Sequence, residues 1–432
     1  MAEALEARSG EYLSGREAKR LLDNVRDGIF RELRQLPAAD GKELLAKVRR
    51  TLDTEIASEQ RFRQEFDAAL QDSRRVGTPA ELARLHNGLN GLVTAYFVRR
   101  DSAPAFHSLC TTVLDTMVGQ TLRLAEEELA GRGFGPPPRY AWLVLGPAGR
   151  RETTLSAELE SLLVHEPGTT AARYCAELAG RATAILEQCG FSTLGRGVMP
   201  DNPSWGAPLD EWRERLDELC RRDSGPRQGH LPALPGLRLD EFFQHRKTDL
   251  SSPLFELSDL RVASGDPELG QELCTLVRAT AERHPVCIDE AALSVAALPS
   301  PFTFLGNFRV ERMGTHRGKL NLNRWACLPL VLMVRHMAVS NGIAATGTLK
   351  RIRALMGEGL LDVELGKRLL KGGLEIFRLK ALLEVRENTG LGNGIYLLPD
   401  SLIPSDEFAF REALEALTNL QKIIHSSMAE KV

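Results

Sequence analysis

Residues 145–164 read Leu-Gly-Pro-Ala-Gly-Arg-Arg-Glu-Thr-Thr-Leu-Ser-Ala-Glu-Leu-Glu-Ser-Leu-Leu-Val, and this stretch decides how we interpret the chain. An apolar run over 140–145 comes directly before the glycine turn and predicts a β-strand. A polar segment with Glu158 and Glu160 follows the turn, and a second apolar strand follows over 162–164. Strand, glycine turn and strand in this order indicate a β-containing unit rather than a purely helical one.

The residues before this unit predict helices. Apolar side chains between 16 and 36 recur at the three- and four-residue spacing of an amphipathic helix. Further helices fit 41–74, 79–99 and 103–130. Long helices joined by short links predict an antiparallel bundle over residues 1–130.

The residues after the bundle predict two further domains. The segment 131–138 is rich in glycine and proline and indicates a domain boundary. Strands and helices follow over 131–290, including a strand over 254–262 with Asp259 and Arg261 near its middle. From 291 to 432 we expect helices over 325–340, 348–356, 362–384 and 406–427. The predicted fold class is α+β: an N-terminal helical bundle, a mixed β-sheet domain with flanking helices, and a C-terminal helical domain.

The bulk composition fits a globular protein. Of 432 residues, 43% are hydrophobic and 26% are charged. The net charge of −3 disfavours nucleic acid as the main partner, because nucleic-acid-binding surfaces are strongly basic. Residues 1–19 are charged and lack the apolar core of a signal peptide. The longest apolar run, over 325–334, is too short to span a membrane, so we expect no membrane partner.

The cysteines indicate a reducing compartment. All seven are scattered, and no Cys-x-x-Cys pair occurs. This spacing predicts neither a zinc site nor a disulfide framework. Reduced thiols are typical of the cytoplasm, which is the location we expect.

The 145–164 stretch and the later strand carry groups that suit a nucleoside triphosphate with divalent metal ions. Backbone amides of a glycine turn can bind phosphate, which points to Gly146 and Gly149. Residues i and i+2 of a strand face the same way, so Glu158 and Glu160 can share a pair of metal ions. Asp259 is the candidate third carboxylate from a neighbouring strand. These three acids are the candidate catalytic residues and metal ligands.

Each of these groups also has a structural interpretation. Glu158 and Glu160 can be solvated acids at a strand end, and Arg150 can contact phosphate or face solvent. Asp259 and Arg261 can form an ion pair within the sheet. The residues by themselves leave these alternatives open.

The glycine turn and its acids resemble the motif of a nucleotidyltransferase family related to protein-PII uridylyltransferase, within the DNA polymerase β superfamily. The family motif reads Gly-Ser-x-Gly-Arg-x-Glu, followed after five positions by Asp-x-Asp. The residues that match the first part are Gly146, Gly149, Arg150 and Glu152, and the acid positions fall at 158 and 160. The segment 258–261 resembles the family's Phe-Asp-x-Arg segment, and the resemblance extends over residues 80–425.

This resemblance implies a fold and an activity. The 131–290 domain would have the nucleotidyltransferase fold, and the C-terminal domain would bind substrate. The implied reaction is metal-dependent transfer of a nucleotidyl group from a nucleoside triphosphate to a protein acceptor in bacterial signalling. Mg²⁺ or Mn²⁺ would be the cofactor, and the nucleotide would contact Gly146, Gly149, Arg150 and Arg261.

Departures from the family pattern fall where this chemistry would take place. Pro147 replaces the serine and removes a hydroxyl and a backbone N–H. Glu158 and Glu160 replace two aspartates, and a shift of about 1 Å in a reacting group can lower a rate on the order of a hundredfold. Asn321 and Asn323 stand where the family tends to have Asp and Lys. We therefore expect weakened catalysis, with a non-catalytic regulator or a nucleotide sensor as the alternatives.

Overall fold

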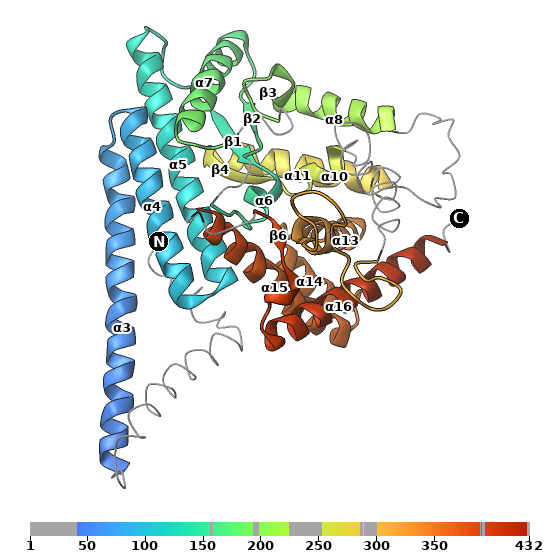
Figure 1. Ribbon diagram of the computed structural model, residues 1–432. Helices are drawn as coiled ribbons and strands as arrows, with labels where there is room; N and C mark the ends of the chain where they lie inside the picture. Colours follow the sequence, from blue (N-terminus) through green and yellow to red (C-terminus); the bar gives the residue numbers. More distant parts are fainter. Residues whose placement is uncertain are drawn as a thin grey trace.

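The computed structural model describes residues 41–155, 159–192, 198–223, 253–285, 288, 300–388, 390 and 394–429. Long helices lie along one side of the molecule, a small β-sheet lies against them, and the C-terminal helices gather at the other side (Figure 1). The fold is α+β, with helical N- and C-terminal regions around a mixed sheet, which confirms the predicted fold class. The predicted helix over 16–36 lies outside the described residues.

Within the part of the chain that the structure describes, three long helices precede the sheet, namely α3 (Gly41–Asp72), α4 (Pro79–Arg100) and α5 (Ala103–Gly131). Helix α4 begins where its sequence predicts, because the Thr78 hydroxyl accepts a hydrogen bond from the backbone N–H of Glu81 at 3.3 Å. Ser102 caps α5 in the same way, by accepting from Ala105. Local capping chemistry therefore sets both helix starts.

The sheet has four strands in the order β3 (Gly206–Pro208), β2 (Ser161–His165), β1 (Tyr140–Val144) and β4 (Arg261–Gly265). Strand β1 pairs antiparallel with both β2 and β4, whereas β2 pairs parallel with β3. Trp142 lies opposite Leu163 on one side and Ser264 on the other. The two strands that flank the glycine turn are thus the central pair of the sheet.

Alternate residues of β1 enter two different hydrophobic cores. Tyr140, Trp142 and Val144 pack with residues of α4, α5 and α7 (Thr169–Gln188). Ala141 and Leu143 pack with α8 (Leu209–Asp223), α11 (Pro267–Arg283) and the C-terminal helices. This is the two-residue period of a strand whose faces are both covered. One face of the sheet is therefore covered by α5 and α7, and the other is covered by α8 and α11. The predicted domain boundaries stay a prediction.

The predicted strand over 254–262 is wrong in its first part. Residues Pro253–Leu257 form a short helix, α10, and the strand β4 begins only at Arg261. Asp259 lies in the connection between them, where backbone hydrogen bonds run from Asp259 to Glu256 and from Leu260 to Leu257. The apolar run alone could not separate a buried helical turn from a strand.

The C-terminal helices match their predicted positions to within a few residues. They are α13 (Leu328–Ser340), α14 (Thr348–Gly357), α15 (Val363–Asn388) and α16 (Pro404–Ala429). A small antiparallel ribbon joins β5 (Leu320–Asn321) to β6 (Tyr396–Leu397). Within the described residues, every helix is too short or too polar to cross a lipid bilayer.

Candidate functional site

The glycine turn follows β1 directly as the single helical turn α6 (Gly146–Gly149). Gly146 has a φ of 60°, which favours glycine, and a side chain there would begin 3.0 Å from Oε2 of Glu160. A Cβ on Gly149 would lie 2.0 Å from the backbone oxygen of Asp259. Close approach to the backbone therefore requires Gly149, and the positive φ favours glycine at 146. The turn lies beside both Glu160 and Asp259.

Only one of the two predicted strand acids is among the described residues. Glu160 is buried just before β2, and its backbone oxygen accepts from the N–H of Leu145 at 3.1 Å. Glu158 lies outside the described residues. The predicted pairing of these two carboxylates around metal ions therefore stays a prediction.

Asp259 is fully buried, and three arginines bind its carboxylate. Oδ1 accepts from Arg351 at 2.7 Å, and Oδ2 accepts from Arg150 at 2.6 Å and from Arg335. Burial by itself would raise the pKa of Asp259, but the charges of Arg335, Arg351 and Arg150 outweigh it and lower the pKa to about 2. The carboxylate is therefore ionised and held from several directions.

The same cluster links the glycine turn to the C-terminal helices. Arg150 also donates to Glu152 at 2.7 Å, and the other oxygen of Glu152 accepts from the N–H of Thr348 at 2.6 Å, at the start of α14. Thr346 donates to the carbonyl of Gly149 at 3.1 Å. Arg150 is buried, so the suggested solvent-facing position is wrong for this residue, and its guanidinium binds Glu152 and Asp259 instead.

The hydrogen-bond partners of Arg261 do not include Asp259, so the suggested ion pair between these two residues is wrong. Its guanidinium donates to both oxygens of Asp115 on α5, at 2.8 and 3.0 Å, and to the carbonyl of Ala148 at 3.1 Å. The neighbouring Arg151 has a φ of 58°, and its half-exposed guanidinium lies 3.8 Å from Asp115. The predicted contact of Arg261 with a nucleotide would have to displace these bonds.

The residues around Asp259 do not fit a divalent metal ion. Magnesium requires carboxylate or other oxygen ligands in near-octahedral geometry. The two oxygens of Asp259 instead accept hydrogen bonds from three cations, which a metal ion would have to replace. Among the described residues, no cluster of three or more His, Cys, Asp or Glu side chains could hold a metal ion.

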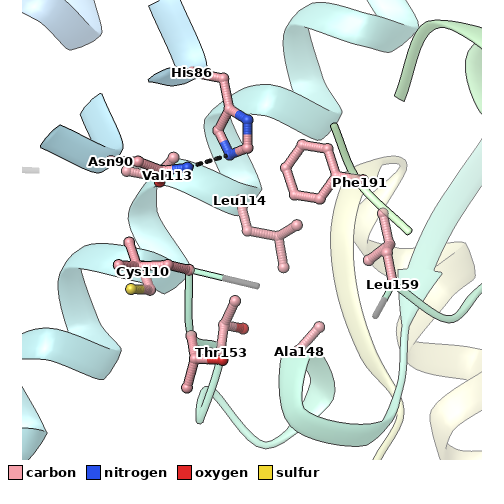
Figure 2. Close-up of a pocket in the computed structure, with 11 residues that line it drawn as sticks. His86, Asn90, Cys110, Val113, Leu114, Ala148, Thr153, Leu159 and Phe191 are labelled. Atoms are coloured by element: carbon pink, nitrogen blue, oxygen red, sulfur yellow. Dashed lines mark hydrogen bonds between the residues drawn. The ribbon is translucent and has the colours of Figure 1, made fainter. Parts of the chain in front are cut away.

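A small cavity lies behind the turn, between α4, α5 and the segment that follows α6 (Figure 2). Its volume of about 20 Å³ has room for one water molecule but not for a nucleotide. On its wall, His86 donates from Nδ1 to the carbonyl of Cys189 at 2.8 Å and accepts at Nε2 from Asn90 at 3.1 Å. Phe191 stacks on the His86 ring at 4.5 Å, and burial lowers the pKa of His86. The cavity is therefore a small packing gap beside the buried, neutral ring of His86.

Comparison with protein families assigns both halves of this arrangement. Residues 87–226 match the family described as "Putative nucleotidyltransferase DUF294", and residues 285–428 match its "Putative nucleotidyltransferase substrate binding domain". The chain belongs to this nucleotidyltransferase family. Its relation to the uridylyltransferases of protein PII remains an inference from resemblance. A comparison with curated proteins finds no match.

In this nucleotidyltransferase-like protein, the two matched regions lie on either side of Asp259 in the sequence, and both contribute arginines to its cluster. The first match includes most of α4, all of α5 and three strands of the sheet, and the second includes α13 to α16. Asp259 lies between them, and Arg335 and Arg351 reach it from the substrate-binding domain. Sequence reasoning missed both arginines as site residues. The sequence could have indicated Arg335, because a single arginine in the otherwise apolar helix α13 needs a buried partner. It is the one Arg, Lys, Asp or Glu of that helix.

Proposed function

We propose that the protein is a signalling regulator that keeps the nucleotidyltransferase fold and does not transfer nucleotides. The observation that carries this proposal is the environment of Asp259. Its fully buried carboxylate accepts from Arg150, Arg335 and Arg351, so the acid expected to hold a metal ion joins two domains instead. A buried ion cluster of this kind is expensive to break, because each unpaired charge would be left in a medium of low polarity.

The composition of the turn supports the same conclusion. Pro147 has no N–H to offer a phosphate, and Arg150 points into the protein toward Glu152 and Asp259. Glutamates replace both strand aspartates of the family motif. The serine of the motif is thus replaced, and Arg150 is engaged elsewhere.

The competing function is transfer of a nucleotidyl group from a nucleoside triphosphate to a protein acceptor, with Mg²⁺ or Mn²⁺ near Glu158, Glu160 and Asp259. One observation favours it: the carboxylate of Glu160 lies beside Gly146, so one acid and the turn remain adjacent. Both functions are consistent with a cytoplasmic signalling protein.

A labelling assay separates the two functions. The full-length protein is incubated with each common nucleoside triphosphate, labelled at the α-phosphate, with Mg²⁺ or Mn²⁺ and a bacterial extract as the source of acceptors. We expect no metal-dependent label on any protein, and no difference between Glu158→Gln or Glu160→Gln and the exposed control Glu127→Gln.

The proposal fails if label appears, depends on metal, and is abolished by Glu158→Gln but not by Glu127→Gln. Calorimetric titration with the same nucleotides adds a distinction within the proposal. Binding without labelling would identify a nucleotide-sensing regulator, and no binding would identify one that acts through protein contacts only.

A further inference from the structure

The segment 301–319, just before β5, forms two consecutive turns that lie beside α13 and α16 (Figure 1). Phe304 is fully exposed, Leu305 is 81% exposed and Met313 is 78% exposed. Single exposed apolar residues are ordinary, but several at neighbouring turn tips indicate an interaction surface.

The first turn is firmly anchored although its tip is exposed. Phe302 and Phe308 pair across it as an isolated β-bridge, and Phe308 packs 5.5 Å from Phe410 of α16. The guanidinium of Arg411 lies 4.6 Å from the ring centre of Phe308 and donates to the carbonyl of Gly306 at 2.8 Å. The tip that carries Phe304 and Leu305 is therefore held in place, which lowers the entropy lost on binding a partner.

The second turn is anchored as well. The N–H of Glu311 donates to the carbonyl of Lys319, and the N–H of Gly318 donates to the carbonyl of Glu311, both at 2.8 Å. The ring of His316 stacks on Tyr396 of β6 with centroids 3.6 Å apart. Met313 thus lies at the tip of a turn that is fixed at its base and on one side.

The charge of this segment is opposite to that of the whole chain. It carries Arg309, Arg312, Arg317 and Lys319 against the single acid Glu311, a formal charge of +3 in a chain of −3. Arg309 is used internally, since it donates to the carbonyl of Phe302 at 3.2 Å. Arg312 and Arg317 are exposed and flank Met313. Exposed apolar residues and exposed cations therefore occur together in one short segment, on two consecutive turns.

We propose that Phe304, Leu305, Met313, Arg312 and Arg317 form a docking surface for an acidic peptide segment of a partner protein that also carries apolar side chains. Aromatic and arginine residues dominate binding energy at protein interfaces, and the positive charge selects an acidic partner. The surface lies within the matched substrate-binding domain.

A peptide fits this surface better than an anionic membrane. Glu407 lies on α16 beside the first turn, where it contacts Arg411 at 3.4 Å, and Asp400 is exposed just after β6. A flat anionic bilayer in contact with the tips of the two turns would also approach these carboxylates and be repelled by them. A peptide is narrow enough to contact Arg312 and Arg317 alone. The inference rests on the proposed regulator and adds the class of its partner. The residues of the docking surface are separate from those of the glycine turn α6.

Peptide selection on the full-length protein tests this docking surface. A random peptide library displayed on phage is selected against the immobilised protein, and enriched peptides are synthesised and measured by fluorescence anisotropy. We expect enriched peptides to be acidic with aromatic or aliphatic side chains, and to bind more weakly as salt is raised. The double variants Phe304→Ser with Leu305→Ser, and Arg312→Glu with Arg317→Glu, should each weaken binding at least about tenfold.

Matched controls are available on the N-terminal helices, where Val98→Ser removes an exposed apolar side chain and Arg49→Glu reverses an exposed charge. Both should leave peptide affinity unchanged. Three results would overturn the proposal: no enrichment, enrichment of neutral or basic peptides, or equal binding by all variants. A different result would assign the surface to a membrane instead. In that case the protein would bind no peptide but would sediment with vesicles of phosphatidylcholine and phosphatidylserine, and the same double variants would abolish this sedimentation. The nucleotide-labelling result does not enter this test, so the two proposals fail separately.

Discussion

A buried carboxylate is stable only when its charge is compensated, and at the scale of the residue Asp259 is compensated three times. Arg150, Arg335 and Arg351 surround it, and Arg335 also lies over the ring of Phe255 at 5.0 Å. The attraction offsets the desolvation of four charged groups, so the cluster is not necessarily a large net gain in stability. Removing Asp259 is different, because Arg335 and Arg351 would then lose this carboxylate in the interior, and Arg150 would keep only Glu152.

We expect the stabilising role of Asp259 to depend on pH in a defined window. Its pKa is lowered from 3.8 to about 2 in the folded protein, so its contribution is complete above pH 3.8 and is lost as the pH falls toward 2. At neutral pH, Asp259→Asn should lower the free energy of unfolding by about 3–5 kcal/mol. That difference from the wild type should shrink below pH 3.8. Urea unfolding at a series of pH values, followed by circular dichroism, measures it.

The control for this measurement is Asp53→Asn on α3, whose exposed carboxylate lies 3.9 Å from Arg49. It should change the free energy of unfolding by less than about 0.5 kcal/mol at neutral pH. A difference between Asp259→Asn and the wild type that is small, or that is the same at every pH, would contradict the three-arginine arrangement.

At the scale of the element, the turn α6 shows how backbone approach restricts sequence. Gly149 leaves no room for a methyl group against Asp259, whereas a methyl group on Gly88, in the interior of α4, would have nothing within 4 Å of it. The two glycines have the same chemistry but opposite surroundings. One is required by tertiary contact, and the other is a weak point in a helix.

Alanine at these two glycines should change stability in opposite directions. Gly149→Ala forces the turn away from Asp259 and should destabilise the protein by about 1–3 kcal/mol or more. Gly88→Ala should stabilise it by about 0.5–1 kcal/mol, because alanine loses less backbone entropy in a helix. Thermal unfolding of both variants measures the effect, and an unchanged or higher midpoint for Gly149→Ala would show that the close approach at Gly149 is wrong.

At the scale of the whole molecule, a second buried charge cluster joins the N-terminal and C-terminal helices. Arg378 of α15 donates to Asp101, between α4 and α5, at 3.0 Å and to Asp406 of α16 at 2.7 Å. It also donates to Glu375 of its own helix at 2.7 Å. Arg378 binds three carboxylates, whereas Asp259 binds three guanidinium groups, and both clusters connect elements far apart in the sequence.

Loss of Arg378 should loosen the attachment of the C-terminal helices. Arg378→Ala leaves three acids close together and should lower the free energy of unfolding by about 3–5 kcal/mol. Arg378→Lys should recover only part of this, because an ammonium group cannot reproduce the planar guanidinium geometry. Urea unfolding gives the energies, and hydrogen exchange of α16 reports the local loosening.

The control variant is Arg368→Ala on the same helix, whose guanidinium lies 3.9 Å from Glu415 with both side chains substantially exposed. It should cost less than about 1 kcal/mol. Equal effects of the two variants, or full recovery by lysine, would count against a directional cluster at Arg378.

Much of the fold could be predicted because its causes are local. Apolar periodicity and capping residues such as Thr78 predict α4 and α5, and the apolar runs on either side of Gly146 predict β1 and β2. The prediction failed over 254–257, where an apolar run forms a helical turn. Strand and helix differ there by packing against neighbouring elements, which a short run of residues does not encode.

The sequence by itself determined the α+β class, the glycine turn and the position of Glu160 near it, because spacing along the chain controls those features. Only the tertiary structure decided what Asp259 does. Its partners Arg335 and Arg351 are 76 and 92 residues away along the chain, so no local sequence pattern around Asp259 predicts them. Whether an acid faces a metal ion or a set of arginines depends on which distant side chains folding brings to it, since electrostatic pairing acts through space and not along the sequence.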